Sequence, residues 1–361
     1  MKLIKLKYNN LHNITYNINL SNSFAVIIVF FGLLLVPKQA YLQDIHFSQY
    51  FNSPLNLNPA LTAYSQADFR MILNNRNQWA SVTVPYKTIS GSFDFKVLKR
   101  KKNMDYFGIG LIFNKDEAGD SHYGTTQIGL SISWVKSLGR RNHHIISFGG
   151  QASYLQRSID YTQLYFPEQW NGNMSNINQS HSEIFTVNSF SFMDYAAGGH
   201  YTFAPSTKFM ISGGLSLWHI SQPNQNLIEN NEAKLNIKTQ IYIESEISTN
   251  SPINVLPGIY TSFQGPYKEI MYGGRINYKV HKQRKKYMAV SAGLYARNKD
   301  AATIYAGLDY KNARLAISYD INTSPLKAAS LYRGGTEISL KWLIHKHNKV
   351  PSIKTTPCPI F

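Results

Sequence analysis

Several residue types in this chain could do chemistry, but their spacing matches no catalytic or metal-binding motif. The sequence holds 11 histidines and one cysteine, Cys358, so an intrachain disulfide and a multi-cysteine metal site are both excluded. No GxSxG, HExxH or CxxC motif occurs. The pair His143-His144 lies at an expected strand start, and His345 and His347 follow the last expected strand. We interpret these histidines as turn or interfacial residues, and we expect no enzyme activity, no cofactor and no metal.

Basic residues are concentrated in short segments that have the character of turns. The clusters are Lys99, Arg100, Lys101 and Lys102; Arg140 and Arg141; and Lys282, Arg284, Lys285 and Lys286. The formal net charge is +17, but no recognised nucleic-acid module accompanies it, so we expect no nucleic-acid partner. Two interpretations stay open: the clusters dock an acidic partner or anionic lipid head groups by long-range attraction, or they are solvated turns.

A second set of charges lies inside segments that alternate between apolar and polar residues. Its members are Arg70, Arg76, Asp94, Arg275, Arg297, Asp309, Arg314 and Glu337. On the lipid face of a membrane barrel an arginine at mid-depth costs roughly 2–4 kcal/mol. These charges are therefore expected to face the lumen, where water and opposite charges can satisfy them. For each residue alone, a solvated pore lining is the simpler interpretation.

The elements that must position these charges are predicted to be long β-strands. In residues 127–134 (QIGLSISW) every second side chain is large and apolar, and the others are small or polar. Similar alternation predicts about fourteen strands, most of roughly ten residues or more, whereas globular strands average about five or six. The expected strands are 69–80, 86–97, 105–114, 122–135, 143–157, 190–204, 207–219, 237–247, 253–264, 268–280, 286–297, 301–311, 313–320 and 335–344.

Alternation alone does not distinguish a membrane barrel from a soluble sandwich, but the lengths of the connections between strands do. The short connections are 98–104, 136–142, 205–206, 248–252, 281–285 and 311–312, and the long ones are 158–189, 220–236 and 321–334. Short periplasmic turns and longer external loops are typical of outer-membrane barrels. We predict an all-β fold, a transmembrane antiparallel outer-membrane β-barrel of about 14 strands over 69–344, closed because lipid cannot satisfy open strand edges. An even strand number places both termini on the periplasmic side.

The amino terminus has the pattern of an export signal. Residues 24–36 form an apolar run that is too short for a comfortable membrane-spanning helix, and Lys2, Lys5 and Lys7 precede it. We expect a signal peptide over residues 1–40; the alternative is an uncleaved anchor helix.

Two further segments lie outside the expected strands. Residues 41–68 carry Pro54 and Pro59 among turn-forming asparagines, which predicts a folded non-strand element. Residues 345–361 form a tail after the last strand, expected on the periplasmic side, and end in an apolar CPIF sequence. Our hypothesis is that one or both segments fold into the lumen or across the periplasmic mouth and close the pore.

Several ordered segments of the chain resemble one known family. Residues 43–62 (QDIHFSQYFNSPLNLNPALT) are similar to the amino-terminal hallmark of the PorP/SprF family of type IX secretion system membrane proteins. Within this hallmark the residues that carry the resemblance are Asp44, His46, Phe47, Gln49, Tyr50, Asn58 and Pro59. Further similar segments are 76–79 (RNQW), 148–164 (FGGQASYLQRSIDYTQL), 218–223 (WHISQP), 318–324 (SYDINTS) and 358–361 (CPIF). The segment 295–301 (YARNKDA) departs from the family's YRxxDA pattern by one inserted residue.

The resemblance implies a function that the residues alone do not show. Members of this family are outer-membrane barrels of Bacteroidota that work with the type IX machinery in the secretion or surface display of cargo such as gliding adhesins. It therefore implies secretion components and secreted cargo proteins as partners, beside outer-membrane lipid. The alternative is an outer-membrane porin or transporter for small solutes that uses the charged lumen. An outer-membrane enzyme such as a lipase is a distant third.

Overall fold

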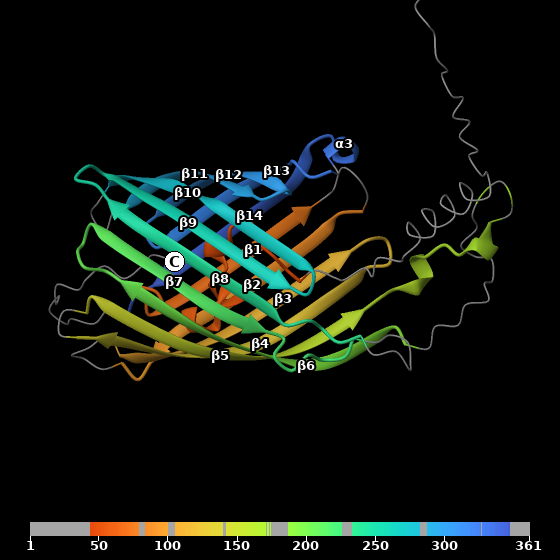
Figure 1. The fold of residues 1–361 in the computed structure, drawn as a ribbon, viewed down its shortest axis with the longest axis horizontal. Helices are drawn as coiled ribbons and strands as arrows, with labels where there is room; N and C mark the ends of the chain where they lie inside the picture. The colour runs from red at the N-terminus through yellow and green to blue at the C-terminus, as the bar shows by residue number, and fades with distance from the viewer. Residues whose placement is uncertain are drawn as a thin grey trace, which may run out of the picture. The chain divides into compact units, whose positions relative to one another are not determined.

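The protein forms one closed antiparallel β-barrel of fourteen strands (Figure 1). The computed structural model describes residues 44–78, 84–99, 105–139, 142–170, 172, 174, 187–225, 233–281, 287–325 and 327–346. Each strand pairs with its neighbours in the sequence, and β1 also pairs with β14, which closes the ring. The strands are β1 (Phe69–Gln78), β2 (Tyr86–Val97), β3 (Tyr106–Ala118), β4 (Tyr123–Leu138), β5 (His144–Ser158), β6 (Ser189–Phe203), β7 (Phe209–Trp218), β8 (Lys238–Ser248), β9 (Ile253–Gln264), β10 (Tyr267–His281), β11 (Met288–Arg297), β12 (Ala301–Tyr310), β13 (Ala313–Asn322) and β14 (Arg333–Ile344).

The predicted fold class and strand number are confirmed, and the boundaries differ by a few residues. The largest difference is at the hairpin of β3 and β4, where pairing continues beyond the expected residue 114 as far as Ala118, which pairs with Tyr123. The added residues of β3 include Lys115, Asp116 and Glu117, whose charge hides the strand signal that alternating apolar residues give elsewhere.

The two faces of the barrel have opposite chemistry. Outward positions carry exposed apolar side chains such as Leu111, Ile132, Leu294 and Ile304, each at least half exposed. Inward positions are polar, and the eight strand charges that the sequence predicts to face the lumen are all buried there. Lipid is the environment that such an exposed apolar face requires. No helix of the described residues combines the length and apolar character needed to cross a membrane.

The two ends of the barrel differ in their connections. At one end, which we call the terminal rim, β1 begins at Phe69 and β14 ends at Ile344, and the two residues are paired. The other end, the loop rim, carries the connections 159–188, 219–237 and 323–332, the last of which contains the short helix α3 (Lys327–Ser330). The three long connections predicted from the sequence therefore all lie at one rim, which also carries the short turns 119–122, 265–266 and 298–300.

Residues 44–68, which we call the N-terminal segment, form the core of the molecule. The segment contains the 3-10 helices η1 (Tyr50–Asn52) and η2 (Pro59–Leu61) and one turn of α-helix, α2 (Pro54–Leu57). Proline fits the first position of a helix because its missing N–H has no partner there in any case. The amide of Ala60 donates to the Asn58 side chain, which caps η2 at 2.9 Å. Figure 1 shows this segment, in orange, inside the ring of strands.

Candidate functional site

The N-terminal segment crosses the lumen from one rim to the other. At the loop rim, Asp44 pairs with His219, which directly follows β7, and with Lys238, which begins β8. At the terminal rim, Asp68 pairs with Lys99 and accepts the backbone N–H of Lys346. The sequence predicts both chain ends at the terminal rim. For the amino-terminal side this prediction is wrong, because Asp44 lies at the loop rim. The even strand number determines only that β1 begins and β14 ends at the same rim.

Every strand of the barrel contacts this segment within hydrogen-bond or ring-contact distance. From β1 to β14, the contacting residues are Asn74, Ser90, Asn114, Ser131, Ser147, Gly199, Ser216, Lys238, Tyr260, Arg275, Tyr295, Tyr305, Ser318 and Glu337. Because one element touches all fourteen strands, it is part of the barrel's core and not a surface appendage. This contact set is the candidate functional site.

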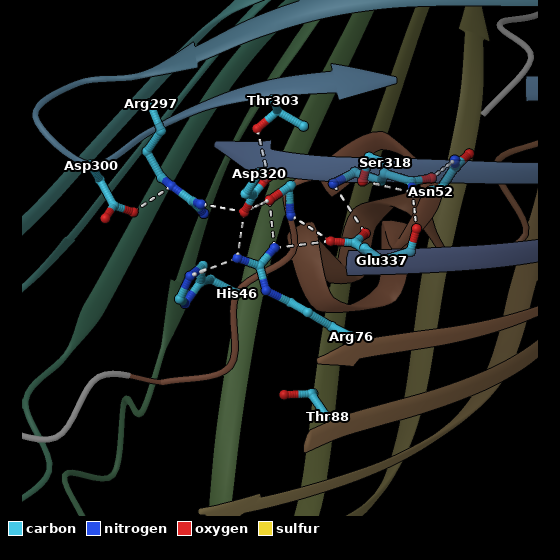
Figure 2. Close-up of polar contacts among 12 residues, drawn as sticks. His46, Asn52, Arg76, Thr88, Arg297, Asp300, Thr303, Ser318, Asp320 and Glu337 are labelled. Atoms are coloured by element: carbon cyan, nitrogen blue, oxygen red, sulfur yellow. Dashed lines mark hydrogen bonds and ion pairs between the residues drawn. The ribbon is translucent and has the colours of Figure 1, made fainter. Parts of the chain in front are cut away.

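A buried network of ion pairs holds the first part of the segment (Figure 2). Arg76 of β1 pairs with Glu337 of β14 at 3.0 Å and with Asp320 of β13 at 2.9 Å, and Arg297 of β11 binds the same Asp320 at 2.6 Å. The segment joins this network through Ser48, whose hydroxyl donates to Asp320 at 2.7 Å. Charges this deeply buried are tolerated only when they are paired and hydrogen-bonded.

Glu337 binds the backbone of the segment directly. Its carboxylate accepts the N–H of Ser48 at 2.8 Å and that of Gln49 at 3.1 Å, while the Gln49 side chain donates to Ser318 at 3.0 Å. Carboxylate bonds to backbone N–H groups are stronger than neutral ones because the acceptor carries charge. The arginine, the two carboxylates and the segment's backbone are thus one connected unit.

His219 forms a separate contact at the loop rim. Its Nδ1 lies 3.0 Å from Asp194 and its Nε2 lies 2.8 Å from Asp44, so each ring nitrogen faces a carboxylate. Burial by itself lowers the pKa of His219, but the two carboxylates outweigh burial and raise that pKa to about 9. Burial likewise favours a raised pKa for Asp44, but His219 and Lys238 hold it well below its usual range. The imidazolium therefore joins the segment to Asp194 of β6.

An aromatic cluster follows in the middle of the lumen. Tyr50 stacks on Tyr260 with ring centroids 5.1 Å apart, and Phe51 lies 5.6 Å from Tyr295 and 5.4 Å from Tyr305. The Arg275 guanidinium lies 3.9 Å from the centroid of the Phe51 ring. Such a cation–π contact attracts the guanidinium to the face of the ring and so stabilises a buried arginine.

The remaining part of the segment is held by close packing and neutral hydrogen bonds. Asn58 donates to the carbonyl of Gly199 at 3.0 Å, and Ser147 donates to the carbonyl of Ala60 at 2.6 Å. The wall opposite carries glycines, and a Cβ at Gly149 would overlap the backbone of Pro59. Gly149 therefore gives room to the segment.

The seven hallmark residues all lie in this segment, and most of their contacts are with the barrel. Asp44 and Gln49 bind the groups given above, His46 lies 3.5 Å from Arg76, and Tyr50 is in the aromatic cluster. Phe47 is buried. Asn58 and Pro59 meet the glycines of β5 and β6.

The basic clusters lie almost wholly outside the described residues. Of them only Lys99 is described, and it forms an ion pair with Asp68, which is a partner within the chain. The remaining members, Arg100, Lys101, Lys102, Arg140, Arg141, Lys282, Arg284, Lys285 and Lys286, lie in segments that the structure does not describe. The docking role of these clusters stays a prediction. The signal segment 1–40 and the tail from residue 347 onward also lie outside the described residues.

Sequence reasoning did not find two of the residues that hold the segment. His219 appears in the sequence only as part of WHISQP, and its two carboxylate partners are 25 and 175 positions away. Asp320 has partners on three strands and in the segment. Such long-range pairs leave no spacing pattern in a single sequence. Among the described residues, no group of three or more His, Cys, Asp or Glu side chains is arranged to hold a metal.

The comparison with protein families identifies the group to which this chain belongs. Residues 39–342 match the model of the type IX secretion system membrane protein PorP/SprF. The chain is a member of the PorP/SprF family. The match covers the N-terminal segment and nearly all of the barrel, so the fold described here is that of a family member placed in the outer membrane.

Comparisons with other proteins give only distant likeness. The toluene transporter TbuX of Ralstonia pickettii has a TM-score of 0.47 and 10% identity, with 81% of this chain and 94% of that chain covered. A FadL homologue of Pseudomonas aeruginosa has a TM-score of 0.46 and 9% identity, covering 80% and 93% of the two chains. The KdgM porin has a TM-score of 0.34 and 11% identity, covering 76% and 99%. No curated protein matches this sequence.

Proposed function

We propose that this PorP/SprF protein is an assembly barrel of type IX secretion that anchors or displays secreted cargo proteins by protein–protein binding. The observation that carries the proposal is the N-terminal segment, which contacts every strand of the barrel. A lumen filled in this way supports a scaffold more than a conduit or an enzyme, because the inward side chains are occupied with holding the segment. Secretion components and cargo are then the partners, and outer-membrane lipid surrounds the barrel.

The lengths of the connections at the two rims indicate how the barrel is oriented in the outer membrane. Long loops of outer-membrane barrels face outward and short turns face the periplasm. We therefore assign the loop rim to the cell surface and the terminal rim, with its basic clusters, to the periplasm. Export depends on the signal segment 1–40. In this orientation Asp44 lies toward the outside, and the basic turns face an acidic periplasmic partner or anionic head groups.

The loop rim offers apolar side chains for cargo binding. Tyr165 and Trp170 in the connection after β5, and Leu331 and Tyr332 before β14, are each more than half exposed. Leu331 and Tyr332 also have left-handed backbone conformations, with φ of 51° and 60°. Aromatic side chains of this kind are the usual anchors of protein interfaces.

Affinity purification of the tagged protein from outer membrane tests the binding role. We expect a secreted protein and type IX components to co-purify with the wild type, and the secreted protein to be lost from the double variant Leu331→Ser, Tyr332→Ser. The matched control is Leu98→Ser, because Leu98 is an exposed apolar residue on the terminal rim. Equal recovery of the secreted protein with both variants would contradict cargo binding at the loop rim.

A porin or transporter is the second candidate, favoured by the charged inner wall that Arg76, Arg297 and Asp320 form. Planar-bilayer recordings separate the two functions. We expect the full chain to conduct far less than a variant in which residues 44–62 are deleted. Large, steady conductance from the intact protein would favour the porin and count against closure by the N-terminal segment.

A further inference from the structure

Strand β6 has an open edge at the loop rim. It pairs with β5 along Ser189–Phe203, its whole length, but with β7 only along Ala197–Phe203. Just beyond β7, the amide of Ile220 donates to the carbonyl of Tyr195 at 3.1 Å, and the chain turns at this point. No described residue forms a ladder with residues 189–193 on the side opposite β5.

The backbone groups that face this edge come from alternate residues. Along a strand, successive residues direct their N–H and C=O groups to opposite sides. The carbonyl of Tyr195 faces the side of β7, so the backbone groups of Met193 and Ser191 face that side as well. The Ser221 hydroxyl donates to the carbonyl of Met193 at 3.4 Å, but the N–H and C=O groups of Ser191 have no bond in the described part of the chain. The edge is therefore open to another strand.

The open edge lies beyond the apolar outer band of the barrel. On this part of the outer face the side chains are apolar as far as Tyr154 and Met193, which are paired and about half exposed. The next outward pair, Gln156 with Ser191, is polar and exposed. Open strand edges do not occur in lipid, where water cannot satisfy them. The edge is therefore in water, at the loop rim.

Nothing in residues 189–193 (SFSFM) protects the edge from other strands. The segment contains no charge and no proline, and its register with β5 has no bulge. Natural proteins protect exposed edges with such features because an unpaired strand is a template for another strand. An edge without them, held rigid by β5 on one side, is suited to receive a strand from outside.

A second copy of this protein does not fit the edge. Copies in one membrane are related by rotation about the membrane normal, so their β6 strands cross the membrane in the same direction. Strands of such barrels are tilted by about 35–45°, and at a contact between two copies the tilts are opposite, so the strands cross steeply. A continuous ladder needs strands that are nearly aligned. The additional strand therefore belongs to a different protein.

The side chains at the edge indicate which kind of segment fits. Phe190 and Phe192 are half-buried on the inner face, with ring centroids 5.8 Å apart, and Ser191 lies on the outer face. Asp194, the next inward residue, is already bound to His219 at 3.0 Å. The edge thus offers aromatic surface on one side, a hydroxyl on the other and no free charge. An uncharged extended segment with apolar side chains at alternate positions matches it.

We propose that this edge of β6 receives an extended segment of a secreted cargo protein, which joins the barrel sheet as an additional strand. Backbone bonds to Ser191 and Met193 supply the affinity, and the two phenylalanines select apolar residues at every second position. The inference rests on the proposed function, in which the loop rim faces the cell surface and binds secreted cargo. It adds the conformation and the side-chain pattern of the cargo segment.

Two substitutions at one position separate backbone pairing from a side-chain contact. Ser191→Pro removes the N–H that faces the open edge and keeps the pairing with β5, because proline is tolerated where the N–H points away from the sheet. Ser191→Ala keeps the N–H and removes only the hydroxyl. The probe is the secreted protein that co-purifies with the wild type. We expect Ser191→Pro to weaken its affinity for the full-length barrel about tenfold, and Ser191→Ala to change it by less than about twofold.

Hydrogen exchange of the wild type gives a direct measurement that does not depend on how the variants fold. When the secreted protein binds, the amides of Ser191 and Met193 should become protected, because they face the added strand. The amides of Phe190 and Phe192 already face β5 and should exchange as before. This alternation of protected and unchanged amides is specific to strand addition, since burial under a bound protein would protect neighbouring residues alike.

The outcomes separate this inference from the proposed function. Equal affinity of the wild type and Ser191→Pro, equal losses in the two variants, or unchanged exchange at Ser191 and Met193 overturns strand addition and leaves cargo binding intact. Absence of any secreted protein from the wild-type purification overturns both. A wild-type dimer in detergent that Ser191→Pro dissociates would show that a second copy occupies the edge, and would also overturn the inference.

Discussion

The two halves of the N-terminal segment are held in the barrel by different physics. Residues 44–52 are held chiefly by charge, through the pairing of Asp44 with His219 and the binding of Ser48 and Gln49 to Glu337. Residues 53–65 are held mainly by shape and neutral bonds, such as that from Ser147 to the Ala60 carbonyl, although Arg70 also donates to the carbonyl of Leu61.

The difference teaches which half can respond to its surroundings. Removing or titrating the partner of a buried charge changes the free energy of unfolding by several kcal/mol, about 3–5 for a lost partner. Packed neutral groups change it mainly when their volume changes. We expect the half near the loop rim to be sensitive chiefly to pH and charge, and the half near the terminal rim to be sensitive chiefly to shape. If the two halves respond alike, this division is wrong.

The largest effect is expected from Arg76→Met. This change removes the cation shared by Glu337 and Asp320 and leaves two carboxylates buried close together. Loss of one partner of a buried ion pair costs about 3–5 kcal/mol. Unfolding in detergent, followed by heat-modifiable migration on gels, measures the loss, and bilayer conductance should rise as residues 44–52 are released. Arg333→Met, at an exposed position on β14, is the control and should change neither quantity.

The second-largest effect on stability is expected from titration of His219. Its pKa in the folded protein is raised to about 9, against about 6.5 for a free histidine, so its contribution to stability is complete below pH 6.5. That contribution declines as pH rises through about 9. Asp44 has a lowered pKa, so its contribution is present above about pH 4 and lost only at lower pH.

The pH dependence is measured as the unfolding midpoint between pH 6 and 10. We expect His219→Gln to lower the midpoint at pH 6 and to remove most of the fall between pH 8 and 10, because the glutamine carries no charge to lose. A parallel fall in both proteins would show that other groups control stability in this range.

The barrel could be predicted from the sequence because its signal is local. Alternation such as that of Ile128, Leu130 and Ile132 repeats within each strand and requires no knowledge of the partner strand. Charged positions such as Arg76 could be assigned to the lumen for the same reason, since lipid excludes them. Both inferences require the sequence of only one strand.

The site could be predicted only in outline. The prolines and asparagines of residues 53–59 mark a folded non-strand element, but not its path from rim to rim. That path depends on pairs such as Asp44 with His219 and Ser48 with Glu337, which are separated by 175 and 289 positions. A single sequence contains no periodicity that links such positions, so three-dimensional structure is required.

Volume changes test the half held by shape. Gly149 and Gly150 are adjacent on β5, but a Cβ at Gly149 overlaps the backbone of Pro59, whereas one at Gly150 meets only the Ala196 carbonyl oxygen at 3.8 Å. We expect Gly149→Ala to lower the free energy of unfolding by about 1–3 kcal/mol because backbone must move. Gly150→Ala should change it by less than about 0.5 kcal/mol. Equal losses in the two variants would mean that the segment does not pack against this wall.

The smallest effect is expected at the terminal rim, where Lys99 pairs with Asp68 at the end of the segment. The Lys99 side chain is 44% exposed, so water and salt screen this pair far more than the buried pairs of the other half. Lys99→Ala should therefore cost less than about 1 kcal/mol, and the cost should vanish in high salt. Unfolding at low and high salt measures both values, with Arg76→Met as the comparison whose loss persists in salt. A large, salt-resistant loss from Lys99→Ala would show that charge also holds the end of the segment at the terminal rim, and the division between its two halves would then fail.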